Sequence, residues 1–516
     1  MNGSQLISKD IENRFHRYLE RTGMTFHSYQ LDGVKWCVHS EINSDLTYGG
    51  VRGGFIADEM GLGKTIMMIG TMVCNRLSRT LIVVPVILIE QWYNQIYKTT
   101  GHKALIYHGN KKKGCSKTDL EKATIVITSY AHITIKKNKK KVDKIVDKKL
   151  DFETTLLHEI QWSRVVFDEA HHLRNSGTGR NIGSRQLKTD IIWLVSGTPV
   201  QNSRKDFYHL CSTLRLSSFE PENIPDIIER FILRRSKKEV GIDCGELVVL
   251  PKEVEWKKKK EMLLSQDIHS YLAINREFKE AIICHGISKG FQASLFDNKR
   301  TLEIYLRAKQ SCILPSLMGS RMIGKELWKS NYSSKIDAVV DCILNKKDNG
   351  NGKLVFCSYR FEMDTIQKKL LDGGMNGIQI LDGRITGNAR KKCLNELSLY
   401  SVLIIQIQTG CEGLNLQEYF NEVYFVSPNW NPCVEDQAIA RCYRIGQKKK
   451  VFVYKFVMIN DCVSNTVIDL MKNLDHSLIK NIIEYIPSVN MKWINMDEYI
   501  VSVQGMKREI IKEFIL

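Results

Sequence analysis

The sequence predicts an α/β protein with two tandem doubly wound lobes, helical insertions and a helical C-terminal tail. Two observations lead to this fold class. Continuous apolar runs, typical of buried parallel strands, alternate with helical stretches, and this alternation is interrupted by a basic helical region and then begins again near Lys335. In addition, several apolar runs end in glycines or carboxylates, which is where a doubly wound sheet places its ligands.

The predicted organisation follows the chain from its first residue. Residues 1–25 are expected to form a polar, mostly helical lead-in, and residues 26–235 the first lobe. Residues 236–330 are expected to be a helical linker or insertion, residues 331–460 the second lobe and residues 461–516 amphipathic bracing helices.

The expected strands are continuous apolar segments. In the first lobe they lie within 80–85, 123–130, 164–171 and 191–199, with a further short strand opening the segment 53–65, and in the second within 353–359, 380–383, 402–405 and 451–456.

Composition narrows the function before any motif is considered. The 516 residues are 43% hydrophobic and 26% charged, which is typical of soluble globular proteins and predicts two to four domains. The formal net charge of +18 points towards a polyanionic partner, nucleic acid rather than membrane, although a solvated lysine excess would give the same number.

Cysteine usage and hydropathy indicate a reducing compartment and no membrane partner. The longest apolar run, Leu81–Ile89, has nine residues and contains Pro85, so it is too short and too broken to span a bilayer. The N-terminus lacks a secretory apolar core. The 14 cysteines include no C-x-x-C pair, which argues against a zinc site or disulfide framework and favours the nucleus or cytosol.

The first candidate site is the segment Gly53–Thr65, a short apolar strand followed by a glycine-bearing turn and a helix rich in Ile and Met. Backbone N–H groups at Gly61 and Gly63 could close around phosphate oxygens, and the helix N-terminus adds its dipole. Lys64 would reach the β- and γ-phosphates of ATP, and Thr65 would hold Mg²⁺. Asp58 stands where the strict phosphate-loop pattern has glycine, so a simple turn before an ordinary helix remains open at this point.

Two adjacent carboxylates favour the phosphate-binding interpretation. Asp168 and Glu169 follow an apolar strand about a hundred residues beyond Lys64. ATP hydrolysis needs one group to position Mg²⁺ and another to orient or deprotonate water, and Asp168 and Glu169 suit these two roles respectively. Upstream, the amide of Gln30 could pair with the adenine edge.

These motifs, in this order, resemble those of the Swi/Snf family of superfamily-two DNA translocases. The resemblance rests on Gln30, Asp-Glu-Met-Gly-Leu-Gly-Lys-Thr at 58–65, Asp-Glu-Ala-His at 168–171 and Ser-Gly-Thr-Pro-Val-Gln-Asn at 196–202. It implies two RecA-like lobes, explains Asp58 as the usual residue of this loop, and makes Gln30 the adenine reader. It also implies that the segment at residues 196–202 couples the nucleotide bound in the active site to the strength of DNA binding.

The second lobe continues the resemblance. Gln408–Leu416, with Gly413, is similar to the family's fifth motif, although Cys411 stands where relatives usually carry glycine. Arg441 and Arg444 are three residues apart, so on a helix both would project from one face. A forked guanidinium suits the charge that builds on a transferred phosphoryl group, and within this family pattern the two are interpreted as arginine fingers.

The resemblance covers about residues 26–460 and implies an ATP- and Mg²⁺-dependent double-stranded DNA translocase that displaces or remodels DNA-bound proteins, such as nucleosomes or transcription factors. The expected location is the nucleus, of the host cell if the protein is viral, or else the cytoplasm. No added chromatin-reading domain is expected, and this compact form resembles the global transactivator-like proteins of insect baculoviruses. Two alternatives remain: a strand-separating helicase, and a catalytically weak DNA-binding transcription scaffold.

One feature outside the motifs is a basic insertion. Lys136–Lys141, together with Lys144, Lys148 and Lys149, lies between two first-lobe strands and is therefore expected on the surface. It could grip DNA phosphates, act as a nuclear-import signal or be a solvated loop.

Overall fold

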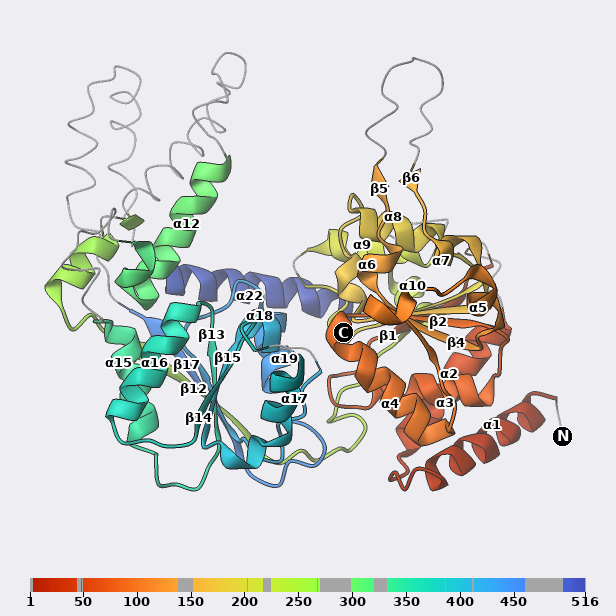
Figure 1. Cartoon of the computed structure of the whole chain (residues 1–516), viewed down its shortest axis with the longest axis horizontal. Coiled ribbons are helices and arrows are strands. Elements are labelled where there is room, and N and C mark those ends of the chain that lie inside the picture. The colour runs from red at the N-terminus through yellow and green to blue at the C-terminus, as the bar shows by residue number, and fades with distance from the viewer. Residues whose placement is uncertain are drawn as a thin grey trace, which may run out of the picture. The chain divides into compact units, whose positions relative to one another are not determined.

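Two parallel β-sheets organise the chain, one in each of two units (Figure 1). The first unit comprises Met1–Cys244 with Lys507–Leu516, and the second Gly245–Met506. The computed structural model describes residues 3–43, 48, 50–137, 152–201, 203–216, 224–266, 268–269, 298–319, 332–385, 387–410, 413–459 and 495–515.

The first sheet has seven parallel strands in the order β11-β1-β10-β8-β2-β4-β3. Their bounds are β1 Arg52–Ile56, β2 Thr80–Val84, β3 Leu105–Tyr107, β4 Ile125–Ser129, β8 Arg164–Asp168, β10 Ile191–Val195 and β11 Ile232–Leu233. Because the strands are parallel, the segments that follow β1, β10 and β8 meet at one edge of the sheet, side by side.

Helices cover both faces of this sheet (Figure 1). Helices α1 Gly3–Glu20, α2 Ser28–Ile42, α3 Lys64–Cys74 and α4 Ile89–Thr100 pack on one face. The other face carries α5 Lys117–Lys122, α6 Tyr130–Ile133, α7 Leu156–Glu159, α8 Gly179–Gln186, α9 Arg204–Thr213 and α10 Ile224–Phe231. Two small pairs add to it, β5 Lys136–Lys137 with β6 Phe152–Glu153 and β7 Gln161–Trp162 with β9 Lys188–Thr189.

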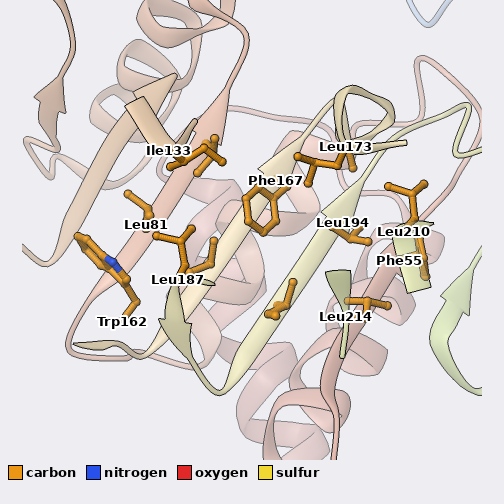
Figure 2. Close-up of a cluster of buried hydrophobic side chains, with 14 of the residues drawn as sticks. Phe55, Leu81, Ile133, Trp162, Phe167, Leu173, Leu187, Leu194, Leu210 and Leu214 are labelled. Carbon is orange, nitrogen blue, oxygen red and sulfur yellow. The ribbon is translucent and has the colours of Figure 1, made fainter. Parts of the chain in front are cut away.

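The apolar runs separate into two cores because successive strand residues point to opposite faces. Leu81 lies in one hydrophobic cluster and Ile82 in the other. Figure 2 shows the first cluster, in which Phe167 of β8 lies between Leu81 and Leu194. Leu210 of α9, and Leu214 directly after that helix, pack on the same cluster. Residues buried on both faces explain why these strands are continuously apolar.

The second sheet has six parallel strands in the order β12-β17-β16-β13-β15-β14. The strands are β12 Leu247–Val254, β13 Lys353–Cys357, β14 Ile378–Leu381, β15 Val402–Gln406, β16 Glu422–Phe425 and β17 Val451–Met458. Helices α15 Ser334–Leu344 and α16 Arg360–Asp372 cover one face, with α12 Asn298–Ile313 and the start of α22 Met496–Ile515 packing in the same core. The other face carries α17 Gly387–Asn395 and α19 Pro432–Ile439, and α18 Ile407–Gly410 follows β15.

The predicted fold class, two α/β lobes with helical additions, is confirmed. One difference concerns residues 236–330, which were expected to be helical: β12 is an edge strand of the second sheet, paired along its length with β17. Its edge position tolerates Pro251, which cannot donate to a neighbouring strand. Residues 271–297 and 461–494, both expected to be helical, lie outside the described residues. Within the part of the chain that is described, no helix is both long and apolar enough to cross a membrane.

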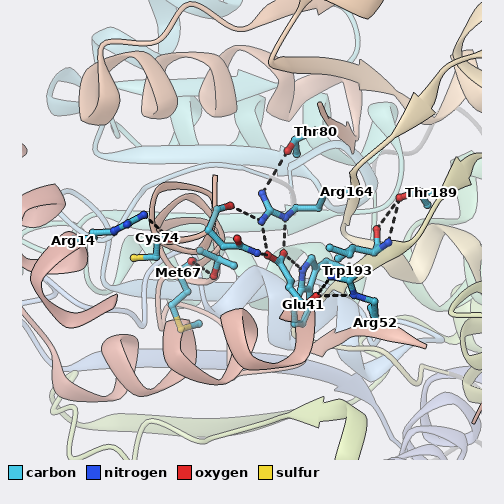
Figure 3. A network of polar contacts seen from close by, with 12 residues as sticks. Arg14, Glu41, Arg52, Met67, Cys74, Thr80, Arg164, Thr189 and Trp193 are labelled. Carbon is cyan, nitrogen blue, oxygen red and sulfur yellow. Dashed lines mark hydrogen bonds and ion pairs between the residues drawn. The ribbon is translucent and has the colours of Figure 1, made fainter. Parts of the chain in front are cut away.

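A buried ion pair fastens α2 to the first sheet (Figure 3). Glu41 and Arg164 are both fully buried, and Nε of Arg164 donates to Glu41 at 2.5 Å. The same carboxylate accepts from Nε1 of Trp193 at 2.8 Å and from Asn75 at 2.6 Å. Both charges are therefore paired and satisfied, as burial of ions requires.

Breaking this pair should cost much more stability than a surface change. Glu41→Ala leaves Arg164 as an uncompensated buried charge, so we expect a loss of about 3–5 kcal/mol in the free energy of unfolding. Denaturant unfolding of the full chain measures it, with Glu121→Ala on the exposed face of α5 as the matched control. The double variant Glu41→Leu/Arg164→Met should recover part of the loss, and a Glu41→Ala protein as stable as the control would contradict the assignment.

Candidate active site

The phosphate-loop segment leaves β1 at the shared edge of the first sheet and enters α3 at Lys64. The loop turns through Gly61 and Gly63, whose φ angles are +94° and +81°. Side-chain-bearing residues rarely adopt these angles, so glycine is required at both positions. The residues Gly61, Gly63, Lys64 and Thr65 are half-buried, which leaves the amino end of α3 accessible to an anion.

Lys64 and Asp58 are held by the loop itself. Nζ of Lys64 donates to the carbonyl oxygens of Asp58, at 2.8 Å, and Glu59, at 3.4 Å. The Asp58 carboxylate is fully buried and receives two hydrogen bonds from Arg235, at 2.6 Å and 3.1 Å. The Asp58 carboxylate is therefore engaged in anchoring the phosphate loop to Arg235.

Gln30 lies against the same loop. Its side chain is 3% exposed, and Nε2 donates to the carbonyl of Leu62 at 3.2 Å. A Cβ added at Gly63 would come within 2.6 Å of this nitrogen, so glycine there also makes room for Gln30. The predicted adenine reader and the phosphate loop are thus brought together.

Asp168 ends β8 and is held from three directions. Trp92 donates through Nε1 to one carboxylate oxygen at 2.7 Å, and the backbone N–H of Glu169 donates to the other at 3.0 Å. Tyr130 donates to the Asp168 carbonyl at 2.7 Å. Burial raises the pKa of Asp168 to about 7, and the Glu169 carboxylate adds to the rise, while the bonds from Trp92 and Glu169 and the charge of Lys64 oppose it.

Glu169 has a φ of +52°, unusual for a residue with a side chain. Such strain is often kept where a side chain has to be aimed. The carboxylate lies 3.3 Å from Nδ1 of His171, and the hydroxyl of Ser196 lies 3.5 Å from the same nitrogen.

The turn after β10 completes this edge. A Cβ added at Gly197 would lie 2.8 Å from Met60 and 3.1 Å from Nζ of Lys64, so the turn packs directly on the phosphate loop. Thr198 donates its backbone N–H to Ser196 at 3.2 Å, and Gln201 donates to Thr198 at 3.2 Å. Asn202 lies outside the described residues.

In the second unit the two arginines lie beside the segment Gly413–Gln417. Nη1 of Arg444 donates to Oδ1 of Asn415 at 2.5 Å, and the carbonyl of Arg441 accepts from the N–H of Leu416 at 3.2 Å. Nε of Arg441 is buried without a hydrogen-bond partner among the described residues. Gly413 has a φ of +74°, whereas Cys411 lies outside the described residues.

The prediction that Arg441 and Arg444 share a helix face is wrong. Helix α19 ends at Ile439, and both arginines occupy the turns that follow. The Arg441 carbonyl is used by Leu416, and Gly446 adopts a φ of +94°, which a helix cannot contain. Gln447 then anchors the turns, because its amide donates to Gln417 at 2.9 Å and to Phe420 at 3.2 Å.

Thr65 and Asp168 suit the predicted Mg²⁺ site. Mg²⁺ takes oxygen ligands and is usually held by one or two carboxylates together with substrate phosphates. No group of three or more His, Cys, Asp or Glu side chains that could hold a metal ion occurs within the described ranges. A cation beside Asp168 would offset the burial that raises its pKa.

Sequence reasoning missed the residues that support the site. Arg235 and Trp92 hold Asp58 and Asp168, but nothing local in the sequence distinguishes either from an ordinary arginine or core tryptophan. The one available signal was the charge of Asp58, which a buried loop cannot accept without a cationic partner.

Comparison with known proteins agrees with this arrangement. Residues 29–224 match the family model of the SNF2-related domain, and residues 334–446 match the helicase conserved C-terminal domain. The probable global transactivator of Orgyia pseudotsugata multicapsid polyhedrosis virus is 27% identical over 83% of this chain and 86% of its own length. The solved Sulfolobus solfataricus SWI2/SNF2 ATPase core in complex with dsDNA is 21% identical, covers 94% of this chain and 97% of its own, and has a TM-score of 0.37.

Two larger relatives match over only part of their length. The ATP-dependent DNA helicase DDM1 of Arabidopsis thaliana is 25% identical over 84% of this chain, which spans 59% of the relative. The human chromodomain-helicase-DNA-binding protein 1 is 27% identical over 89% of this chain and 27% of its own length. The two domain matches together take in more than half of the residues and contain the candidate site residues of both units. The chain therefore belongs to the SNF2 family, the helicase-like ATP-hydrolysing enzymes of superfamily two.

Proposed function

We propose that the chain uses ATP hydrolysis to move along double-stranded DNA and to displace or remodel proteins bound to it. The observation that carries this proposal is the edge of the first sheet, where the phosphate loop, the Ser196–Gly197 turn and the Asp168–Glu169 pair follow three neighbouring strands. An anion site beside two carboxylates is the arrangement that phosphoryl transfer to water needs.

Each side chain at this edge takes a separate task. Lys64 exchanges its two carbonyl contacts for the β- and γ-phosphates, and the N–H groups of the loop and of α3 bind the remaining oxygens. Thr65 and Asp168 hold Mg²⁺, which supplies positive charge to the phosphate oxygens. Glu169 orients the attacking water and accepts its proton. Gln30 reads the adenine edge from its position against Gly63.

The second unit contributes two positive charges, those of Arg441 and Arg444, to the proposed site. Arg441 and Arg444 stabilise the transferred phosphoryl group once the two lobes close around ATP. Closure favoured by DNA would make hydrolysis depend on DNA, and reopening after hydrolysis would advance one lobe along the duplex.

The proposed partners are double-stranded DNA and the proteins bound to it, such as nucleosomes or transcription factors. The net charge of +18 suits a polyanion, and DDM1 and the human relative are both named for their action on or binding to DNA. The proposed location is accordingly the nucleus, of the host cell if the protein is viral.

A displacement assay separates translocation from strand separation. A third strand annealed to a duplex is released by a protein moving along that duplex, whereas a forked duplex reports unwinding. We expect ATP-dependent release of the third strand, no separation of the fork, and no release with Glu169→Gln. Separation of the fork would favour a strand-separating helicase, and DNA binding without either activity would favour a transcription scaffold.

A further inference from the structure

A thiol and an amine lie side by side at the carboxyl end of α15, the helix that packs against β12 and β17. Nζ of Lys346 donates to Sγ of Cys342 at 3.3 Å. The two residues are four positions apart, the spacing at which successive helical turns bring side chains together. Both side chains are partly exposed, and the proposed ATP site uses neither of them. The pair is therefore a cluster of reactive groups outside that site.

Three contacts hold the amine of Lys346 in this place. Besides its contact with the sulfur, Nζ donates to the carbonyl oxygen of Cys342 at 3.3 Å and lies 4.9 Å from the ring centroid of Tyr454. Tyr454 is itself held by β17 and by stacking on Tyr424, with ring centroids 4.7 Å apart. A free lysine side chain has many rotamers, so these contacts raise the fraction of time that its nitrogen spends beside the sulfur.

A cavity of about 320 Å³ opens beside the pair, which forms part of its lining. Lys252 and Glu253 of β12 add one charge of each sign to the wall. Asp341 also lines the cavity, and its ion pair with Lys257 at 3.5 Å offsets its negative charge. The volume is at the lower end of the range for small-molecule sites, so a small solute can reach the sulfur.

Comparison with Cys115 shows what distinguishes Cys342. Among the cysteines that the structure describes, these two are the ones that are not buried. Burial raises the pKa of the Cys115 thiol, and the negative charge of Asp119 raises it further. The thiolate is the nucleophilic form of cysteine, and a neighbouring lysine favours it whereas a neighbouring carboxylate opposes it. Cys342 has an ammonium group at its sulfur where Cys115 has a carboxylate nearby, so exposure alone is not what makes Cys342 reactive.

We propose that Cys342 and Lys346 form a peroxide-sensitive modification site, in which oxidation joins Sγ of Cys342 to Nζ of Lys346 by a covalent bond. The sulfur, having lost its proton to solvent, attacks one oxygen of hydrogen peroxide. An S–O bond forms, the O–O bond breaks, and the leaving hydroxide takes a proton from the Lys346 ammonium group to become water. The product is a sulfenic acid beside a neutral amine.

The amine then closes the cross-link. Its nitrogen attacks the sulfur, the S–N bond forms, the S–O bond breaks, and the hydroxyl group leaves as water with a proton from the nitrogen. Overall the sulfur loses two electrons and one peroxide is reduced to two waters. A separation of 3.3 Å is within the near-attack range of about 3–3.5 Å, so the amine competes well with a second peroxide. The cross-link thereby keeps Cys342 from irreversible oxidation to the sulfinic acid.

Peptide mass spectrometry of the wild-type full chain tests the site. The chain is treated with hydrogen peroxide, alkylated with iodoacetamide and digested with trypsin, which cuts after unmodified lysine. The segment 336–347 contains a single cysteine, Cys342, so it cannot form a disulfide within itself. We expect this peptide to lose two hydrogen atoms, to escape alkylation and to be no longer cut after Lys346. Dithiothreitol should restore the thiol and the amine, with its own two thiols becoming a disulfide.

Two matched variants make the test specific to Lys346. Lys346→Arg keeps a positive charge at the sulfur, but a guanidinium group stays protonated and cannot supply the nucleophilic nitrogen. We expect this variant to form no cross-link and to accumulate oxygen atoms on Cys342 instead. Lys347→Arg changes the adjacent exposed lysine and should form the cross-link as the wild type does. Cys115 serves as the control within each sample, and its peptide should not lose two hydrogen atoms.

Three results would overturn the proposal. Cys342 could remain fully open to alkylation after peroxide treatment, or it could gain oxygen atoms while trypsin still cuts after Lys346. The same loss of two hydrogen atoms in Lys346→Arg would instead place the new bond on a backbone nitrogen. The measurement uses neither ATP nor DNA, so its outcome is independent of the proposed motor activity.

Discussion

Replacing Arg444 by alanine is expected to reduce DNA-stimulated ATP turnover by about a thousandfold, the loss typical of removing one transition-state arginine. Its guanidinium is positioned by Asn415 at the end of the turns that follow α19. Because it would act on charge that develops during transfer, ATP and DNA binding should change little. Steady-state ATP hydrolysis with and without saturating duplex measures the effect.

Two further variants make the Arg444 test specific. Arg444→Lys keeps the charge but loses the fork, so it should recover only part of the turnover. Lys368→Ala, at an exposed position on α16, should behave like wild type. If Arg444→Ala were stimulated by DNA to the wild-type level, Arg444 would not be an arginine finger and the two-lobe mechanism would fail.

Glu169→Gln should retain ATP binding and lose hydrolysis by about a hundred- to ten-thousandfold, the range for a positioned general base. Glutamine has the same side-chain length as glutamate. The backbone strain at φ +52° is therefore the same in the variant as in the wild type. Lys64→Ala should instead weaken ATP binding, because the proposed phosphate contact is lost. Nucleotide affinity and single-turnover hydrolysis separate the two, with Glu121→Gln on α5 as the control. Near wild-type hydrolysis by Glu169→Gln would remove Glu169 from the proposed role.

The parts of the fold that could be predicted from sequence are those with continuous apolar strands. β2, β4, β8 and β10 are buried on both faces, so their sequences carry an uninterrupted signal. β16 was missed because it begins with Glu422, a carboxylate whose burial is offset by hydrogen bonds from Asn349, Asn351 and Tyr424 at 2.6, 2.9 and 2.7 Å. β3 has only three residues and gives no periodicity.

The site shows the same division between local and non-local causes. The glycines of the phosphate loop could be assigned because a turn with positive φ requires them locally. The end of α19 before Arg441 could not be predicted from the sequence. It depends on hydrogen bonds that form outside the helix, from Leu416 to the Arg441 carbonyl and from Gln447 to the Gln417 carbonyl. The anchoring of Asp58 by Arg235 spans 177 positions and leaves no local pattern.

The basic insertion remains a prediction. Its two ends form the antiparallel pair β5–β6, in which Lys136 lies opposite Glu153, but the lysines beyond Lys137 lie outside the described residues. If it grips phosphates, neutralising four of those lysines should flatten the salt dependence of DNA binding by up to about four charges. An unchanged slope would identify a solvated loop.

The central claim, that ATP hydrolysis is driven by double-stranded DNA, is tested most directly by one rate measurement. The ATPase rate of the full chain is compared without nucleic acid and with saturating duplex DNA, single-stranded DNA or RNA. We predict a low basal rate and the largest stimulation by the duplex, because duplex bound to both lobes favours the closed, catalytically complete state. A rate that is the same in all four conditions, or highest with RNA, would contradict it.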